Sequence, residues 1–314
     1  MTSEKQKKIG IIGAPLGFGA GRVGSELGVN AMRVSQIRGR RLFEHIEDLG
    51  YLVTDHGDAE IVKPLIPAQP TENPKYFSEV IASTQNIFEA VSTLVSNDEL
   101  PVILGGDHTI AIGTFSAMSA AGRSTGSEIG LLWFDAHADI NTPETTTTGN
   151  VHGMPLAVLL GHGPTELTEI GGFSPKLDRK YLAHVGGRDL DFGERSRVLD
   201  LSLRDNFFTM SDIDRRGMFA CMQDALSIVS KAPGGFAVTF DIDAIDPTFA
   251  PGSGTLVRGG LTYRESHLAL EMIAAHGGMR SFEIVEVNPM LDNSNITVEL
   301  ACELILSALG KTIL

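Results

Sequence analysis

The chain has 314 residues, a formal net charge of −14 at pH 7 and a hydrophobic fraction of 42%. This length and composition are those of a globular protein that can bury a substantial core. The excess of acidic residues argues against nucleic acid or an anionic membrane as a partner, because both attract clustered Lys and Arg. Apolar runs fall short of the roughly 18 residues of a membrane span. The segment Met1–Lys8 lacks the apolar core of a signal peptide.

The number and placement of the cysteines argue against two kinds of site. The only two cysteines, Cys221 and Cys302, lie in stretches with helical periodicity. We therefore expect neither a disulfide framework nor a cysteine-based zinc site, and a reducing cytoplasm is the expected location.

Short apolar runs predict strands that are buried on both faces of a parallel sheet. In chain order they are Ile9–Ile12, Pro101–Leu104, Ile129–Phe134, Leu182–Val185, Gly235–Phe240 and Phe282–Val285. Helical patterns alternate with them, at 77–95, from a capping box at Thr262–Glu265 to Gly277, and at 298–309. Strand–helix alternation predicts an α/β fold with a mainly parallel sheet. No repeat or linker interrupts it, so we expect one domain over residues 1–314, with surface loops at 68–75 and 142–150.

Acidic and histidine clusters follow four of these predicted strands. They are Gly105–His108, Asp135–Asp139, Asp241–Pro247 and Glu286–Pro289. Each cluster therefore sits at the carboxyl end of a strand, which is the edge where open α/β sheets bind ligands.

The spacing inside two clusters predicts a metal site. Residues two apart point to the same side of an extended chain, so Asp135, His137 and Asp139 can converge, as can Asp241 and Asp243. Four carboxylates brought together repel one another unless cations are present. With imidazoles from two histidines and no thiolate, the ligand set favours Mn²⁺, with Fe²⁺, Co²⁺, Ni²⁺ or Zn²⁺ as alternatives. Six ligands suit two ions better than one tetrahedral ion.

Some acidic residues have a simpler structural explanation. Asp107 follows Gly106 and Asp246 precedes Pro247, and both are interpreted as turn or cap residues. The glycine pattern Gly19–Gly24 fits a dinucleotide-binding loop, but the acidic residue such a site needs falls in a helical pattern at 44–48. These glycines are better explained by a close passage of backbone along the active-site rim.

The order and spacing of these motifs resemble those of the ureohydrolases, and of arginases in particular, over almost the whole chain. The matching segments are Gly105–His108, Asp135–Pro143, Gly149–Pro155, Asp241–Asp243 with Asp246–Pro247, Gly259–Glu265 and Val285–Pro289. The resemblance implies a three-layer α/β/α domain with an eight-stranded sheet and two Mn²⁺ ions per subunit. One ion would be held by His108, Asp135, Asp139 and Asp241, and the other by His137, Asp135, Asp241 and Asp243.

The resemblance also implies residue roles. A hydroxide that bridges the metals would attack the guanidinium carbon, with Asp139 accepting its proton and Glu286 holding the guanidinium group. His152 would relay protons between the amine product and solvent. The substrate-binding positions implied are Asn141, Thr146, Thr148, Asn150 and Thr255, with Asp191 and Glu194 on the amino group. Thr148 replaces the usual serine and Phe192 a common proline.

The expected reaction is hydrolysis of L-arginine to L-ornithine and urea. Another ureohydrolase, acting on agmatine, guanidinobutyrate, formiminoglutamate or guanidine, is the main alternative. A catalytically silent homologue that serves as a binding module is a second alternative, and a nucleotide-dependent oxidoreductase ranks last. By resemblance the subunits would assemble as trimers or hexamers.

Overall fold

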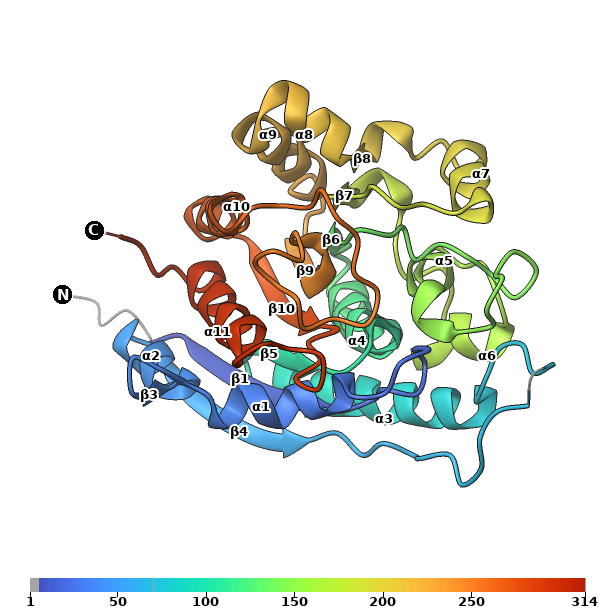
Figure 1. The fold of residues 1–314 in the computed structure, drawn as a ribbon, viewed down its shortest axis with the longest axis horizontal. Coiled ribbons are helices and arrows are strands. Elements are labelled where there is room, and N and C mark those ends of the chain that lie inside the picture. Colours follow the sequence, from blue (N-terminus) through green and yellow to red (C-terminus); the bar gives the residue numbers. More distant parts are fainter. Residues whose placement is uncertain (1–5, 70, 314) are drawn as a thin grey trace.

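A computed structural model of the chain describes residues 6–69 and 71–313 and has one parallel eight-stranded sheet at its centre (Figure 1). In order across the sheet the strands are β4 (Leu52–Asp58), β1 (Lys8–Ala14), β5 (Leu100–Gly105), β10 (Met279–Val285), β9 (Phe236–Asp241), β6 (Gly130–Phe134), β7 (Leu182–Val185) and β8 (Phe207–Phe208). Every neighbouring pair is parallel. The predicted α/β architecture is confirmed.

Helices cover both faces of the sheet (Figure 1). One core contains buried residues of α1 (Gly28–Val34), α2 (Leu42–Asp48), α8 (Met210–Arg216), α9 (Met218–Val229), α10 (Tyr263–His276) and α11 (Ile296–Ala308). The other contains residues of α3 (Phe77–Ser96), α4 (Ala111–Ser124), α5 (Pro155–Leu159) and α7 (Phe192–Asp200). The short α6 (Thr165–Thr168) joins a third, smaller cluster. The fold is therefore three-layered, as expected.

Strand β6 shows how sequence alternation builds the two cores. Leu132 and Phe134 belong to one core, and Leu131 and Trp133 belong to the other. Successive side chains of a strand point to opposite faces, so a strand between two helical layers is apolar throughout. This is why the apolar runs predicted the central strands correctly.

The predicted helices are also confirmed. The capping box at the start of α10 has the Thr262 hydroxyl accepting from the Glu265 amide at 3.2 Å, and the Glu265 carboxylate accepting from the Thr262 amide at 2.9 Å. The helix ends at Gly277, whose φ is 73°. Glycine adopts this left-handed backbone conformation with little steric strain.

The sequence pattern did not identify the two edge strands. The residues of β4 are largely exposed and polar, because one side of an edge strand has no neighbour. Strand β8 has only two residues. A small antiparallel pair, β2 (Gln36–Ile37) with β3 (Arg40–Arg41), was also not predicted.

The remaining segments fit the expectations where they are described. In the polar stretch 68–75, residue 70 lies outside the described residues, and the others contain no helix or strand. Residues 1–5 of the segment Met1–Lys8 also lie outside them. Among the helices of the described chain, none is long and apolar enough to cross a membrane.

The packing of Phe134 generates a stability prediction. Its ring is fully buried and stacks on Phe240 with a centroid separation of 4.9 Å. Phe134→Ala should lower the free energy of unfolding by about 3–5 kcal/mol, because it leaves a cavity in the core. Urea unfolding followed by circular dichroism measures this. The control is Phe219→Ala, because Phe219 is 55% exposed, and its change should stay within roughly 0.5 kcal/mol. Equal losses in the two variants would contradict the assignment of Phe134 to the core.

Candidate metal centre and active site

Four adjacent strands at the centre of the sheet bring the predicted clusters together. Strand β5 ends three residues before His108, and β10, β9 and β6 end immediately before or at Glu286, Asp241 and Asp135. The chain reaches this arrangement by crossing over, since β10 inserts between β5 and β9. Residues more than a hundred positions apart in the sequence therefore meet at one sheet edge.

The first group surrounds the imidazole of His108. Its Nδ1 atom lies 3.1 Å from Asp135, 3.2 Å from Asp139 and 3.3 Å from Asp241, measured to carboxylate oxygens. Its Nε2 atom lies 2.9 Å from the hydroxyl of Thr239, and Nδ1 is buried without a hydrogen-bond partner. With the proton on Nε2, a nitrogen lone pair and three carboxylate oxygens converge on one point, which is the donor geometry that a cation requires.

The second group shares Asp135 with the first. The Nδ1 atom of His137 lies 3.4 Å from Asp135 and 3.1 Å from Asp243. The other oxygen of Asp135 belongs to the first group. Within each of the sets His108–Asp135–Asp139 and Asp135–His137–Asp243, the ligand atoms all lie within 4.8 Å of one another. Asp135 therefore has one carboxylate oxygen in each group.

Electrostatics in the site indicate a deficit of positive charge. Burial, Asp243 and Asp135 raise the pKa of Asp241 well above its usual range. Burial and Asp135 raise the pKa of Asp139 to about 6. Burial disfavours the charged form of His108, yet three carboxylates raise its pKa well above the usual value. Without cations the site would thus take up protons, and the donor set of two imidazoles and four carboxylates fits divalent metals of the manganese type.

Two residues of the site have strained backbone. Asp139 has a φ of 49° and Glu286 a φ of 62°, in the left-handed region that non-glycine residues rarely adopt. Hydrogen bonds hold both in place: the Asp139 carbonyl accepts from the Leu156 amide at 2.9 Å, and the Glu286 amide donates to the Gly106 carbonyl at 2.7 Å. Such strain gathers at functional sites, where it aims a side chain that a relaxed strand end would direct elsewhere.

Glu286 and His152 form a pair beside the first group. One carboxylate oxygen of Glu286 lies 3.0 Å from Nδ1 of His152 and accepts from the His108 amide at 3.0 Å. Burial favours neutral His152, but the bond to Glu286 outweighs it and raises the pKa of His152 to about 9. The sequence did not predict this contact, because 134 positions separate the two residues.

A cleft of about 190 Å³ opens above these groups. His137, Asp139 and Asp241 form part of its wall, and all the implied substrate-binding positions line it: Asn141, Thr146, Thr148, Asn150, Asp191, Glu194 and Thr255. His152 lines it as well, whereas His108, Asp135, Asp243 and Glu286 are buried and absent from its wall. The structure therefore brings every predicted site residue either into the cleft or directly around the two groups.

Several cleft residues already have partners. Asn141 donates to Asp191 at 2.8 Å, and the side chain of Asn150 accepts from Lys75 at 2.9 Å. The hydroxyls of Thr146 and Thr148 are 3.5 Å apart. The hydroxyl of Thr255 donates to Asp243 at 2.8 Å, which ties the cleft wall to the second group.

Asp191 and Glu194 also have a structural role that the sequence analysis did not identify. They form the capping box of α7, with Asp191 accepting from the Glu194 amide at 2.8 Å and Glu194 accepting from the Asp191 amide at 3.0 Å. Glu194 also accepts from the Ala138 amide at 3.2 Å. Burial and Asp139 raise the pKa of Glu194 to about 7. Helix α7 therefore starts at the cleft, and its cap residues face the site.

Three supporting residues were missed. The indole of Trp133 donates to Asp135 at 3.0 Å, and the hydroxyl of Thr239 contacts His108. Each lies two positions before a strand-end Asp, so strand periodicity could have identified them. The guanidinium of Arg188 donates to the carbonyls of Asp243 at 2.7 Å, Ala244 at 3.0 Å and Val257 at 2.7 Å. No local sequence signal indicates that last role.

The residues interpreted as structural have the expected contacts. Asp107 accepts from the Thr109 amide at 3.0 Å, and Asp246 accepts from the Thr248 and Gly259 amides at 2.9 and 2.7 Å. The glycine loop does pass along the rim. A Cβ on Gly19 would lie 2.1 Å from the Thr109 hydroxyl, and the Gly19 carbonyl accepts from the His152 amide at 3.2 Å.

Known proteins give an independent view of this arrangement. The model of the arginase family matches residues 7–310. An arginase from Bacillus subtilis is 40% identical over 98% of this chain and 99% of its own length. The native structure of arginase from Bacillus caldovelox, 38% identical, superposes with a TM-score of 0.91 over 98% of this chain and all of that one. Formimidoylglutamase from Bacillus subtilis, 24% identical with a TM-score of 0.73 over 98% of this chain and 88% of that one, shares the fold. The chain therefore belongs to the arginase family.

Proposed function

We propose that the protein hydrolyses L-arginine to L-ornithine and urea at a binuclear manganese centre. The observation that carries this proposal is the convergence of His108, His137 and four buried carboxylates beneath a cleft lined by neutral hydroxyl and amide groups. The similarity to arginases at about 40% identity over the whole chain supports the same substrate.

The two groups support the proposed metal ligands, and the family resemblance adds Asp241 to the second set. One ion would be held by His108, Asp135, Asp139 and Asp241, and the other by His137, Asp135, Asp241 and Asp243, with both bridging carboxylates at strand ends. When bound, the two cations offset the clustered negative charge and activate a water molecule as a nucleophile at neutral pH.

The protein's own groups then handle the substrate and the protons. The Glu286 carboxylate, fixed by the His108 amide, is placed to hold the guanidinium group by charge-assisted hydrogen bonds. Asp139 lies in the cleft wall beside the ligand groups, where its carboxylate would be placed to accept a proton from the nucleophile and pass it on. His152 lines the cleft and contacts Glu286, so it can deliver a proton toward the leaving amine and recover it from solvent.

Substrate recognition would come from the outer part of the cleft. Asn141, Thr146 and Thr148 offer neutral donors to an α-carboxylate, and Asn150 and Thr255 complete the wall. Asp191 and Glu194 offer carboxylate oxygens to an α-ammonium group. Both carboxylates are already fixed by the capping box, so the site is organised before the substrate arrives.

Another ureohydrolase activity, on agmatine, guanidinobutyrate, formiminoglutamate or guanidine, uses the same metal chemistry. Agmatine and guanidinobutyrate each lack one of the two α-groups. Polar partners left unmatched in a site discriminate against such analogues. Both the Thr-containing loop and the Asp191–Glu194 segment line the cleft. The cleft therefore favours arginine over agmatine and guanidinobutyrate.

Three further features belong to the proposal. Residues 1–314 would form a single catalytic domain, since eight of the ten strands in the described part of the chain lie in one sheet. The enzyme would be cytoplasmic, as its two cysteines suggest, and would assemble as a homo-oligomer of three or six subunits, as the family resemblance implies.

The metal assignment predicts which variants lose which ions. Purified enzyme should hold close to two Mn²⁺ per chain. Asp135→Asn or Asp241→Asn should weaken both sites, by more than about tenfold, whereas His108→Ala should mainly empty one. Elemental analysis and Mn²⁺ titration measure this, with Asp246→Asn, a turn residue, as the control that retains both ions. A fully active enzyme with a single ion would refute the binuclear centre.

The contact between His152 and Glu286 predicts a pKa change. In the metal-free protein His152 should titrate near pH 9, because Glu286 stabilises its charged form. Glu286→Gln removes that stabilisation, so the midpoint should fall toward or below the usual value of about 6.5. Histidine ring NMR signals followed across pH 5–10 report both midpoints. His162, outside this cleft, serves as an internal control and should titrate unchanged. A His152 midpoint that stays near 9 in the variant would contradict the pairing.

The cleft wall predicts substrate preference. L-Arginine should be hydrolysed with higher kcat/KM than agmatine. Thr148→Ala should raise KM for arginine roughly tenfold or more, as expected when a hydrogen bond to a charged group is lost, with little change for agmatine.

Thr148→Ser, which keeps the hydroxyl, is the matched control and should keep or improve arginine turnover. Steady-state urea release after Mn²⁺ loading measures all three enzymes. If the wild-type enzyme prefers agmatine or guanidinobutyrate, the arginine assignment fails and the ureohydrolase assignment stands.

A further inference from the structure

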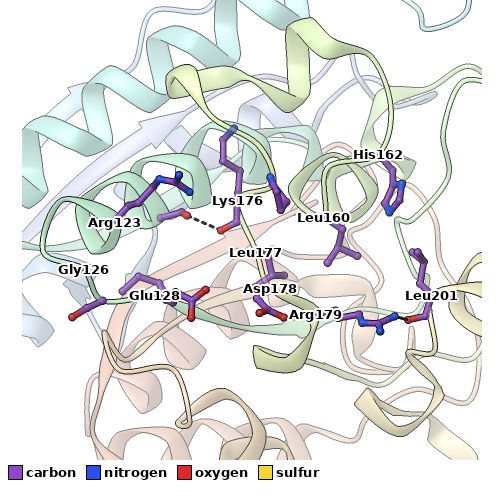
Figure 2. A pocket seen from close by; sticks show the side chains of 14 residues that line it. Arg123, Gly126, Glu128, Leu160, His162, Lys176, Leu177, Asp178, Arg179 and Leu201 are labelled. Carbon is purple, nitrogen blue, oxygen red and sulfur yellow. Dashed lines mark hydrogen bonds between the residues drawn. The ribbon is translucent and has the colours of Figure 1, made fainter.

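A second cavity, of about 510 Å³, lies away from the metal groups (Figure 2). Its lining includes Ile129, just before β6, and Arg179, in the turn that precedes β7. It therefore opens at the amino ends of these strands, whereas the metal groups lie at the carboxyl ends. Its walls come from the end of α4, the residues after α5, the segment 175–179 and Leu201, which follows α7.

Two cations meet on one wall of this cavity. The guanidinium carbon of Arg123 lies 4.8 Å from the centre of the Phe173 ring, and the ammonium nitrogen of Lys176 lies 4.4 Å from the same centre. Figure 2 shows the two side chains next to each other. Lys176 is buried and donates to the carbonyls of Thr168 and Phe173. Both cations line the cavity, and this wall therefore carries an excess of positive charge.

This charge lacks a counterion. Burial and Arg123 lower the pKa of Lys176 to about 8, although Glu169 acts in the opposite direction. Within the part of the chain that the structure describes, the side chain of Arg123 has its ring contact but no hydrogen bond or ion pair. Arg123 is exposed and Lys176 is buried, and among the described residues no carboxylate forms an ion pair with either of them. An anion beside them would relieve their repulsion.

The acidic residues of the cavity do not supply that anion. Glu128 and Asp178 line it, but both carboxylates pair with Lys180, at 3.6 and 2.6 Å. Arg179 adds a third cation on another wall, where one of its nitrogens donates to the Leu201 carbonyl. The arginine side chains therefore supply the charged hydrogen-bond donors of the cavity, beside the neutral side chains of Ser127 and His162.

The rest of the lining combines the polar side chains of Ser119, Ser127 and His162 with an apolar part. The side chains of Ile129, Leu160 and Leu177 contribute to it, and Figure 2 shows Leu160 and Leu177 between the Arg123 wall and the Arg179 wall. A volume of about 510 Å³ lies within the range of cavities that hold small organic ligands. Apolar area combined with a few convergent polar groups is the usual composition of such sites.

We propose that this cavity binds a small organic carboxylate with an apolar body. The Arg123 guanidinium would receive the carboxylate through paired hydrogen bonds, a geometry that arginine provides and lysine does not. Lys176 adds favourable charge, and the apolar body lies against Leu160 and Leu177. A neutral ligand would leave the Arg123 charge unmatched, so the site discriminates in favour of the anion.

The site is separate from the catalytic cleft but is connected to it by two short helices. The residues Leu160 and Leu201 follow the carboxyl ends of α5 and α7. The amino ends of the same helices adjoin His152 and the Asp191–Glu194 cap at the cleft. The cavity and the cleft share no lining residue. A ligand in the cavity should therefore bind without displacing a ligand from the cleft.

The test uses the full-length, Mn²⁺-loaded enzyme with 3-phenylpropanoate as the probe. Its affinity is measured by isothermal titration calorimetry and by saturation-transfer NMR, with 3-phenylpropanamide as the neutral comparison. We expect the acid to bind at least roughly tenfold more tightly than the amide and Arg123→Gln to abolish that difference. Arg215→Gln, at an exposed arginine on α8, is the matched control and should bind like the wild type.

Two further measurements separate the cavity from the catalytic cleft. Saturating L-ornithine should leave the affinity for the probe unchanged, and so should Thr148→Ala. Equal binding of acid and amide, or full affinity in Arg123→Gln, would overturn the proposal. Displacement of the probe by ornithine would also overturn it, because the carboxylate would then occupy the cleft.

Discussion

The repulsion among buried carboxylates at the centre of the sheet is the constraint on which the rest of this structure depends. Asp135, Asp139 and Asp241 approach the same nitrogen of His108 within 3.3 Å, in a region almost closed to water. Such an arrangement is unfavourable unless positive charge or protons compensate it. The raised pKa values of Asp139 and Asp241 show the cost in the absence of cations. Metal binding and folding of the strand ends should therefore stabilise each other.

Backbone amides make the arrangement possible. Asp135 accepts from the His137 amide at 2.7 Å, and Asp241 accepts from the Asp243 amide at 2.7 Å. In Asp241 the other carboxylate oxygen approaches His108, and in Asp135 the two oxygens face the two groups. The positively charged Arg188 side chain donates hydrogen bonds to the carbonyls of Asp243 and Val257, and it thereby joins the loop after β9 to the segment around Val257. The parallel sheet thus supplies a rigid edge, and the loops after each strand orient the ligands.

The substrate cleft extends this organisation outward. The capping box of α7 uses Asp191 and Glu194 both to start a helix and to face the cleft. The strained backbone at Glu286 aims its carboxylate between the His108 amide and His152. Structural and chemical roles therefore coincide in the same residues, so variants here should be judged by binding and titration as well as by activity.

The sequence by itself determined the central strands, the principal helices and the residue types of the metal site. Apolar runs such as Leu131–Phe134 indicated strands between two helical layers, and the Asp-x-His-x-Asp spacing indicated side chains that can converge. These properties are local, so they can be read from the order of residues. The edge strand β4 was not predictable in this way, because its polar residues are explained only by its position at the edge of the sheet.

Tertiary structure alone decided which strands are neighbours and hence which distant residues meet. The insertion of β10 between β5 and β9 brings Glu286 to His108 and His152, and the position of Arg188 under the Asp243 loop depends on the pairing of β7 with β6 and of β6 with β9. The charged cavity around Arg123 and Lys176 also joins segments that share no local pattern. Long-range packing fixes these contacts, since local periodicity specifies the faces of an element but not the element that covers them.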